Sequence, residues 1–191
     1  MDSQRFAAKL FTLPAGEVPE KDFVLFFHRV IQGNLLDETT IDVTDYSHVP
    51  DGPGVMLICH EAHYGMDRGG GRLGLRCATK RGATGDTAAR IQRVLGKVLR
   101  LAELMEGHEI FGGRVRFDTR AALVSIEDRL VAPSTQETFD AVAPVLAEVA
   151  TRAWGAPPVL VRMGSAKEPF QVELSAPNAP SVGELLGRLE G

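Results

Sequence analysis

The segment over residues 86–106 constrains the fold more than any other, because its apolar side chains fall on one face of a helix. They recur at intervals of three and four residues, which is the period of an amphipathic helix, and they end shortly before Gly107. A helix with so broad an apolar face is stable only when that face packs on a large apolar surface. The residues of the face are Ile91, Val94, Leu95, Val98, Leu101, Ala102 and Met105.

Segments in which apolar and polar residues alternate can supply that surface, since alternation is typical of half-buried strands. They predict single strands over 5–12 and 39–45, and hairpins over 54–80, 114–130 and 159–176. The hairpin over 114–130 is expected to turn near Thr119 and Arg120. Three further amphipathic helices are predicted over 19–34, 134–154 and 181–190. The last two open with the spacing of a capping box, Ser134 to Glu137 and Ser181 to Glu184.

The predicted order of elements is therefore β-α-β-β-β-α-β-β-α-β-β-α. Hairpins separated by helices favour an α+β domain, with a largely antiparallel sheet of about seven to eight strands and about four helices. The stretch from the first helix to the third is similar in element order to the small dimeric chaperones of bacterial secretion systems. That similarity implies a chaperone-like arrangement of elements and carries no activity by itself.

The bulk properties indicate one cytoplasmic domain over residues 1–191. A chain of 191 residues that is 44% hydrophobic can bury one sizeable core. Its formal net charge of −4 gives no general attraction to nucleic acid or to acidic membranes, which argues against both as partners. No apolar run approaches the roughly 20 residues that cross a bilayer, the N-terminus lacks a secretory signal, and the two cysteines form no CxxC pair.

The side chains that most resemble a reactive site gather in residues 54–80, which hold two histidines, a glutamate between them and both cysteines. The run "HEAH" lacks the spacing of four residues on a helix by which histidines bind zinc in hydrolases. The glycines at 69–71 match neither a Walker loop nor a dinucleotide-binding fingerprint. We therefore predict no metal, no cofactor and no catalytic residue here, and interpret the segment as a hairpin.

Strand alternation divides this hairpin into two faces. A turn at Asp67–Gly70 places an apolar set on one face and a polar set on the other. The polar face, formed by Glu61, His63 and Arg76, is most simply explained by a cross-strand ion pair of Glu61 with Arg76, and a ligand site is the alternative. The expected cross-strand pairs are Tyr64 with Leu73, Ala62 with Leu75, His60 with Cys77, and Glu61 with Arg76, and Met56 and Ile58 share the apolar face.

The helix over 86–106 also carries a basic stripe, which consists of Arg90, Arg93, Lys97 and Arg100. Their spacing of three and four residues aligns them on one face. This pattern is typical of a solvated helix face, and it is also a candidate binding surface for an acidic protein partner. Just before the helix, Lys80 and Arg81 form a second candidate, an anion site at the helix N-terminus, with an ordinary capped loop as the alternative.

The helix over 19–34 is apolar over more than half its girth, since Val24 and Leu25 lie outside its main apolar stripe. Such a helix is explained either by a homodimer that covers it or by a thick core that buries it.

The run over residues 26–67 resembles a group of small bacterial proteins that are uncharacterised, and this resemblance implies no activity and no site residue. We therefore expect a non-enzymatic cytosolic protein-binding or adaptor domain. The alternative is a small-molecule-binding protein or an enzyme that uses the polar face of residues 55–80.

Overall fold

The computed structural model describes residues 3, 5–13, 17–49, 52–80 and 84–191 and contains one eight-stranded sheet and four α-helices. It confirms the α+β class and the antiparallel sheet. The strands are β1 (Phe6–Thr12), β2 (Thr40–Tyr46), β3 (Gly54–Cys59), β4 (Ala62–Asp67), β5 (Gly74–Thr79), β6 (Phe117–Ile126), β7 (Val159–Met163) and β8 (Phe170–Ser175). The helices are α1 (Glu20–Gly33), α2 (Thr87–Gly107), α3 (Gln136–Trp154) and α4 (Val182–Glu190).

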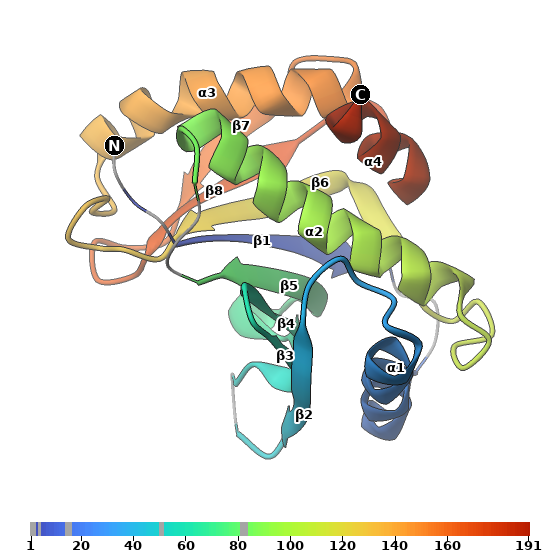
Figure 1. Cartoon of the computed structure of the whole chain (residues 1–191). Coiled ribbons are helices and arrows are strands. Elements are labelled where there is room, and N and C mark those ends of the chain that lie inside the picture. Colours follow the sequence, from blue (N-terminus) through green and yellow to red (C-terminus); the bar gives the residue numbers. More distant parts are fainter. Residues whose placement is uncertain (1–2, 4, 14–16, 50–51, 81–83) are drawn as a thin grey trace.

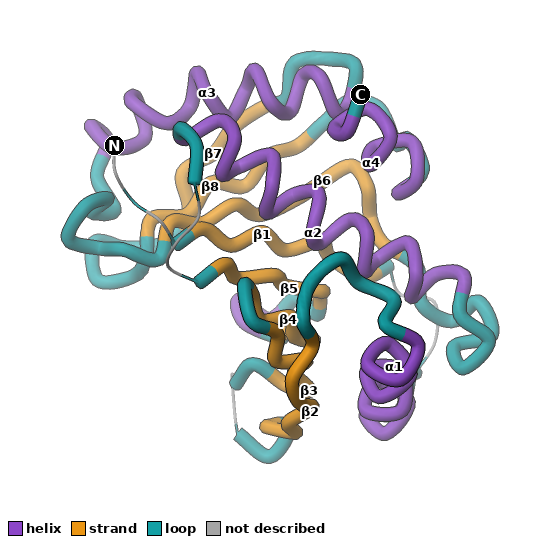
Figure 2. The backbone as a smooth tube through the Cα atoms, in the orientation of Figure 1, coloured by secondary structure: helices purple, strands orange, loops and turns teal. Residues whose placement is uncertain are grey.

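The strands lie in the order β2-β3-β4-β5-β1-β6-β8-β7, and every neighbouring pair is antiparallel. Strand β1 is therefore central, while β2 and β7 are the two edges (Figure 1). Helix α2 crosses β1 and β5 with α3 and α4 beside it, and α1 packs on β2 and β3 at one end of the sheet (Figure 2). Within the described residues, no helix is both long and apolar enough to cross a bilayer.

A single core lies between the sheet and these helices. Every second residue of β1, namely Phe6, Ala8 and Leu10, faces the apolar stripe of α2, and all seven predicted stripe residues are buried. Each fully buried Leu or Ile contributes about 1.5–3 kcal/mol relative to exposure, so this contact is a main source of stability. The stripe of α1 is buried as well, except that Ile31 is half-buried. Outside the stripe Val24 is half-buried and Leu25 is exposed, so the homodimer and the thick core both stay open as explanations of this helix.

The segment 54–80, predicted as one hairpin, forms three strands because the chain turns twice within it. An additional turn at His60 and Glu61 separates β3 from β4. The predicted pairing of His60 with Cys77 is therefore wrong: His60 is exposed at the turn, whereas Cys77 is buried in the core. The run before this turn, Val55–Cys59, is apolar at every position, so no alternation fixes which side chains point inward.

That turn reverses the two predicted faces of β3. Val55 and Leu57 are buried in the core, whereas Met56 and Ile58, which were expected inside, lie half-buried on the other face.

The pairing of β4 with β5 differs from the prediction by four residues along β5. Tyr64 lies opposite Cys77 instead of Leu73, and Gly65 rather than Glu61 lies opposite Arg76. The connection between these strands spans residues 68–73, which is longer than the predicted turn. A shift by an even number of residues leaves each side chain on its face, so Tyr64 and Cys77 still face the core as predicted.

Residues 117–126 form one continuous strand, β6, where a turn at Thr119 and Arg120 was predicted. Neither residue readily takes the positive φ of a tight hairpin turn. Strand β6 pairs with β1 along its length, with one register shift between Leu10 and Thr12. Residues 114–130 thus contain one strand where two were predicted, and residues 54–80 contain three where two were predicted. The total of eight strands therefore agrees with the prediction.

The helix termini follow the sequence closely. The predicted capping box of Ser181 with Glu184 is confirmed at the start of α4. Helix α3 is capped by Thr135, one residue later than the predicted Ser134, and it continues through Pro144 as one helix.

Candidate functional site

The four residues of the basic stripe on α2 have different partners in the structure. Arg90 donates a hydrogen bond to the backbone carbonyl of Ser3. Lys97 and Arg100 are each held by carboxylates. Arg93 is exposed, and it forms no hydrogen bond or ion pair with any residue that the structure describes. The stripe is therefore not a uniform positive surface, because its available charge is concentrated at Arg93.

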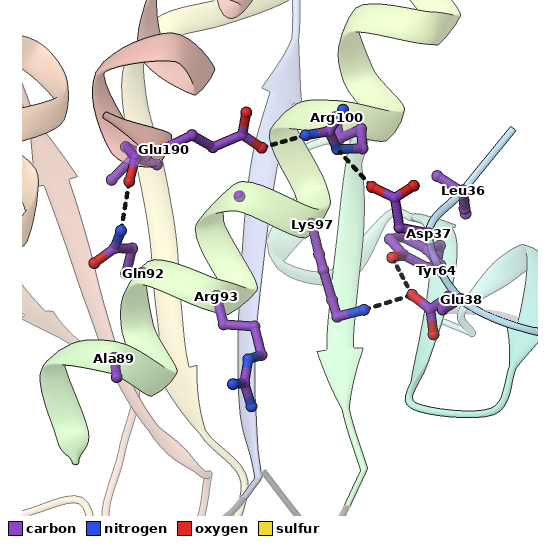
Figure 3. A pocket seen from close by; sticks show the side chains of 12 residues that line it. Leu36, Asp37, Glu38, Tyr64, Ala89, Gln92, Arg93, Lys97, Arg100 and Glu190 are labelled. Carbon is purple, nitrogen blue, oxygen red and sulfur yellow. Dashed lines mark hydrogen bonds and ion pairs between the residues drawn. The ribbon is translucent and has the colours of Figure 1, made fainter. Parts of the chain in front are cut away.

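A pocket of about 490 Å³ lies beside this stripe, between α2, the end of α4 and the connection from α1 to β2. Leu36 and Leu189 supply apolar walls, and Gly96 leaves room at the surface of α2 because no atom lies within 4 Å of the place of a Cβ. Arg93, Lys97 and Arg100 line the same pocket (Figure 3). The volume and the mixture of apolar walls with a few polar groups are typical of small-ligand sites.

The polar end of the pocket is built around the buried carboxylate of Glu38. The hydroxyl of Tyr64 donates to its Oε1 at 2.6 Å, and the Nζ of Lys97 donates to the same oxygen at 2.8 Å. The backbone N–H of Glu61 donates to Oε2 at 3.2 Å. Figure 3 shows Lys97 reaching from α2 toward Glu38 on the opposite wall. The network ties α2 to β4 and to the connection that follows α1.

Lys97 has a second carboxylate partner, Glu61, at 3.2 Å. Burial alone lowers the pKa of Lys97, but the hydrogen bonds and charges of Glu38 and Glu61 outweigh burial and raise it. Burial and the neighbouring anionic groups raise the pKa of Tyr64 as well. Lys97 is therefore a fixed cation and Tyr64 a neutral hydrogen-bond donor at neutral pH. Neither group is tuned to exchange protons there, so the network acts as a structural clamp.

Arg100 closes the other end of the pocket. It forms an ion pair with Glu190 at the end of α4, and its Nε lies 4.0 Å from the Oδ2 of Asp37 (Figure 3). Gln92 donates to the backbone carbonyl of Leu189, which holds the end of α4 against α2. These contacts fix the walls of the pocket without using Arg93.

The polar face predicted for the hairpin is not brought together as one site. Glu61 lies at the turn between β3 and β4 and binds Lys97 on the helix side of the sheet. Arg76 lies on the opposite side and pairs with Glu127 at 2.8 Å, so the expected ion pair of Glu61 with Arg76 is wrong. His63 is half-buried beside β5, and burial, followed by the charge of Lys80, lowers its pKa. The alternation of β4 could not place Glu61, because that residue belongs to a turn.

Of the two residues of the candidate anion site before α2, the structure describes Lys80. The Nζ of Lys80 donates to the backbone carbonyl of Cys59 at 2.6 Å, and Arg81 lies outside the described residues. At the start of α2 the carboxylate of Asp86 accepts the backbone N–H of Ala89 at 2.8 Å. The helix terminus therefore has an intramolecular anion, as expected for the capped-loop alternative.

The two cysteines are free thiols in the core. Burial raises the pKa of Cys59 to about 12, and burial raises the pKa of Cys77 in the same way. Thiols of this kind are inert, since the thiolate is the nucleophile. In the described part of the chain, no three side chains of His, Cys, Asp or Glu are placed to hold a metal ion.

A second polar cluster lies on the sheet face opposite the helices, where a groove of about 390 Å³ runs beside β1. Its centre is Lys9, which is only 3% exposed and binds Asp67 at 3.1 Å and the backbone carbonyl of Gly69 at 2.9 Å. Burial lowers the pKa of Lys9, and the charge of Asp67 opposes this effect. The guanidinium of Arg72 stacks on the ring of Phe11. Lys9 thus anchors the connection after β4 to the sheet.

Two residues of the pocket, Glu38 and Tyr64, were not predicted from the sequence. Glu38 lies in a connection without periodicity, and Tyr64 was expected only as a core residue. The helical spacing of Arg93, Lys97 and Arg100 was the one signal of this site that the sequence carried.

The fold and the pocket define the protein as an α+β domain in which one antiparallel sheet supports a ligand-sized site beside α2. No family model matches the chain, and no curated protein is significantly similar to it. The resemblance of residues 26–67 to uncharacterised bacterial proteins therefore stays a prediction.

Proposed function

We propose that this protein is a non-enzymatic binding domain whose pocket beside α2 holds a ligand with an anionic group on an apolar body. The observation that carries the proposal is Arg93, a cation at a pocket with apolar walls that has no partner among the described residues. A guanidinium binds carboxylate, phosphate or sulfonate groups through paired N–H donors. Leu36 and Leu189 would contact the apolar part of such a ligand.

Binding without catalysis is supported by the chemistry of the neighbouring groups. Lys97 and Tyr64 are committed to Glu38, and their pKa values lie far from neutrality in directions that keep each group in one state. Both cysteines are buried thiols. The pocket therefore offers charge and shape but no poised acid, base or nucleophile among these groups.

An acidic side chain next to an apolar one in a partner protein has the same chemistry as a free amphipathic anion. The expected role as a protein-binding or adaptor domain with an acidic partner fits this pocket, and we propose that partner as the biological source of the anion. We also propose a cytoplasmic location, since a reducing compartment keeps Cys59 and Cys77 in the free state in which the structure has them.

The first test is a fluorescence titration with 1-anilinonaphthalene-8-sulfonate, an apolar dye with one sulfonate. We expect saturable binding to the native protein and a loss of affinity of about tenfold to a hundredfold in Arg93→Gln, because a hydrogen bond to a charged group contributes about 1.5–3 kcal/mol. The matched control is Arg129→Gln, since Arg129 is also exposed and has no described partner but lies far along the chain, after β6. Equal affinities of the wild type and Arg93→Gln would contradict the proposal.

A second arm distinguishes the sources of the anion. A synthetic peptide of alternating glutamate and leucine is added to the protein saturated with dye. Displacement of the dye by this peptide, and not by a peptide of alternating lysine and leucine, supports an acidic protein segment. A peptide that fails to compete while the dye still depends on Arg93 contradicts the protein partner and leaves a free amphipathic anion as the ligand.

A further inference from the structure

Strand β7 is an edge strand with an unusual surface. Val159, Val161 and Met163 alternate along it on the sheet face away from the helices, and they are 65%, 51% and 37% exposed. On one side β7 pairs with β8, and on its other side it has no strand partner within the described chain. The strand thus presents both apolar side chains and backbone hydrogen-bonding groups to a partner.

The opposite edge of the same sheet is protected. Strand β2 has an irregularity in its pairing between Thr40 and Asp42, and it exposes two carboxylates, Asp42 and Asp45. Charges and bulges of this kind prevent edge strands from pairing with other chains. Strand β7 has neither a bulge nor a proline in Val159–Met163, and its one charged residue, Arg162, donates to the backbone carbonyl of Ser134 in its own chain. Strand β2 also exposes Ile41 and Tyr46, but β7 lacks the pairing irregularity and the exposed carboxylates that β2 has.

We propose that two copies of this chain pair through β7 in an antiparallel manner about a twofold axis, which joins their sheets into one. Antiparallel strands related by a twofold axis present the same surface to each other. Only the register centred on Val161 pairs the whole five-residue strand. In that register Val161 lies opposite Val161 of the second copy, and Val159 lies opposite Met163. Each exposed apolar side chain therefore meets another, and Arg162 lies opposite Leu160 instead of opposite a like charge.

The size of the contact predicts how strong the dimer is. Stable interfaces bury about 1,200–2,000 Å² in total, and two strands of five residues supply only part of that area. Interfaces below this range are typically weak and transient, so we expect a reversible dimer that forms as the protein concentration rises. It does not depend on the proposed ligand, because the pocket is lined by α2, α4 and the connection before β2.

Analytical ultracentrifugation of the full chain from low to high micromolar concentration tests the dimer. We expect the wild type to shift from monomer to dimer and Val161→Lys to stay monomeric. The matched control is Ile41→Lys, which places the same charge at an exposed position of the other edge, β2, and should dimerise like the wild type. A wild type that is monomeric throughout, or a Val161→Lys variant that dimerises equally well, would overturn the proposal.

Disulfide trapping tests the register and does not rely on a disruptive variant. Opposed residues of antiparallel strands have Cα atoms about 4.5–5.5 Å apart, which a disulfide can bridge. Under oxidation by copper phenanthroline, Val161→Cys should give a covalent dimer at least tenfold faster than Val159→Cys, whose counterpart in the second copy is Met163. The native cysteines do not interfere because both are buried. Equal rates for the two variants would refute the register.

Discussion

Replacing Glu38 by glutamine tests whether the clamp beside α2 stabilises the fold. The side chain of Glu38 is almost fully buried and accepts hydrogen bonds from Tyr64, from Lys97 and from the backbone of Glu61. Removing one partner of a buried ion pair costs about 3–5 kcal/mol. Lys97 keeps a second partner in Glu61, although that side chain is 59% exposed and such pairs contribute only about 0.2–1 kcal/mol. We therefore expect Glu38→Gln to lower the free energy of unfolding by about 2–3 kcal/mol.

Urea denaturation followed by circular dichroism measures this loss, with an unchanged m-value as the sign that the native and unfolded states are otherwise alike. Glu61→Gln is the control, because it removes the exposed partner of Lys97 and should cost less than about 1 kcal/mol. A cost below about 0.5 kcal/mol for Glu38→Gln, or equal costs for the two variants, would refute the assignment of Glu38 as the centre of the clamp.

Three further predictions concern pH, thiols and packing. The difference in unfolding free energy between the wild type and Glu38→Gln should hold up to about pH 10 and shrink above it. The folded state raises the pKa of Lys97 above the ordinary value of 10.5, so the charged lysine stabilises the fold below that pH. This contribution is lost as the pH rises through the pKa of Lys97 in the folded protein. Cys59 and Cys77 should resist iodoacetamide in the native protein and react in urea, since burial raises both pKa values, to about 12 for Cys59. Gly74→Ala should destabilise the fold by about 1–3 kcal/mol, because its Cβ would lie 2.4 Å from a backbone oxygen of β1.

A different result would contradict each of these three predictions. A difference that grows above pH 10.5 would contradict the sign of the pKa shift of Lys97. Rapid alkylation of the native protein, as judged by mass spectrometry, would contradict the burial of the thiols. For the packing prediction, Gly187→Ala is the control, since no atom lies within 4 Å of its Cβ position in α4 and alanine favours a helix. Thermal melts that rank Gly74→Ala as the more stable of the two would contradict the close approach of β5 to β1.

The sequence predicted those helices and strands in which the spacing of apolar residues leaves only one face that can be buried. The apolar stripe of α2 and the alternation of Phe170, Val172 and Leu174 in β8 each define one buried face. The run Val55–Cys59 is apolar on both faces of the strand, so the sequence could not show which face of β3 points into the core. The turn at 60–61 decided that orientation, and it has no glycine or proline to mark it.

The candidate site was predicted only on its helical side. Helical spacing aligned Arg93, Lys97 and Arg100, but it could not show that carboxylates neutralise Lys97 and Arg100 and leave Arg93 without a described partner. Glu38 is 59 residues from Lys97 along the chain, and only tertiary packing brings the two together. The burial of Lys9 was missed for the same reason, because it depends on the connection after β4 that folds back on the sheet.

Chemical-shift mapping in solution shows whether an amphipathic anion binds in the pocket beside α2, as we propose. A ¹H–¹⁵N spectrum is recorded while 1-anilinonaphthalene-8-sulfonate is added to the uniformly labelled protein. The largest changes should fall on the backbone amides of Leu36, Gly96 and Leu189 and on the side-chain Nε–H of Arg93. Changes on β7 or on the sheet face around Lys9, with these four signals unchanged, would contradict binding in the pocket beside α2.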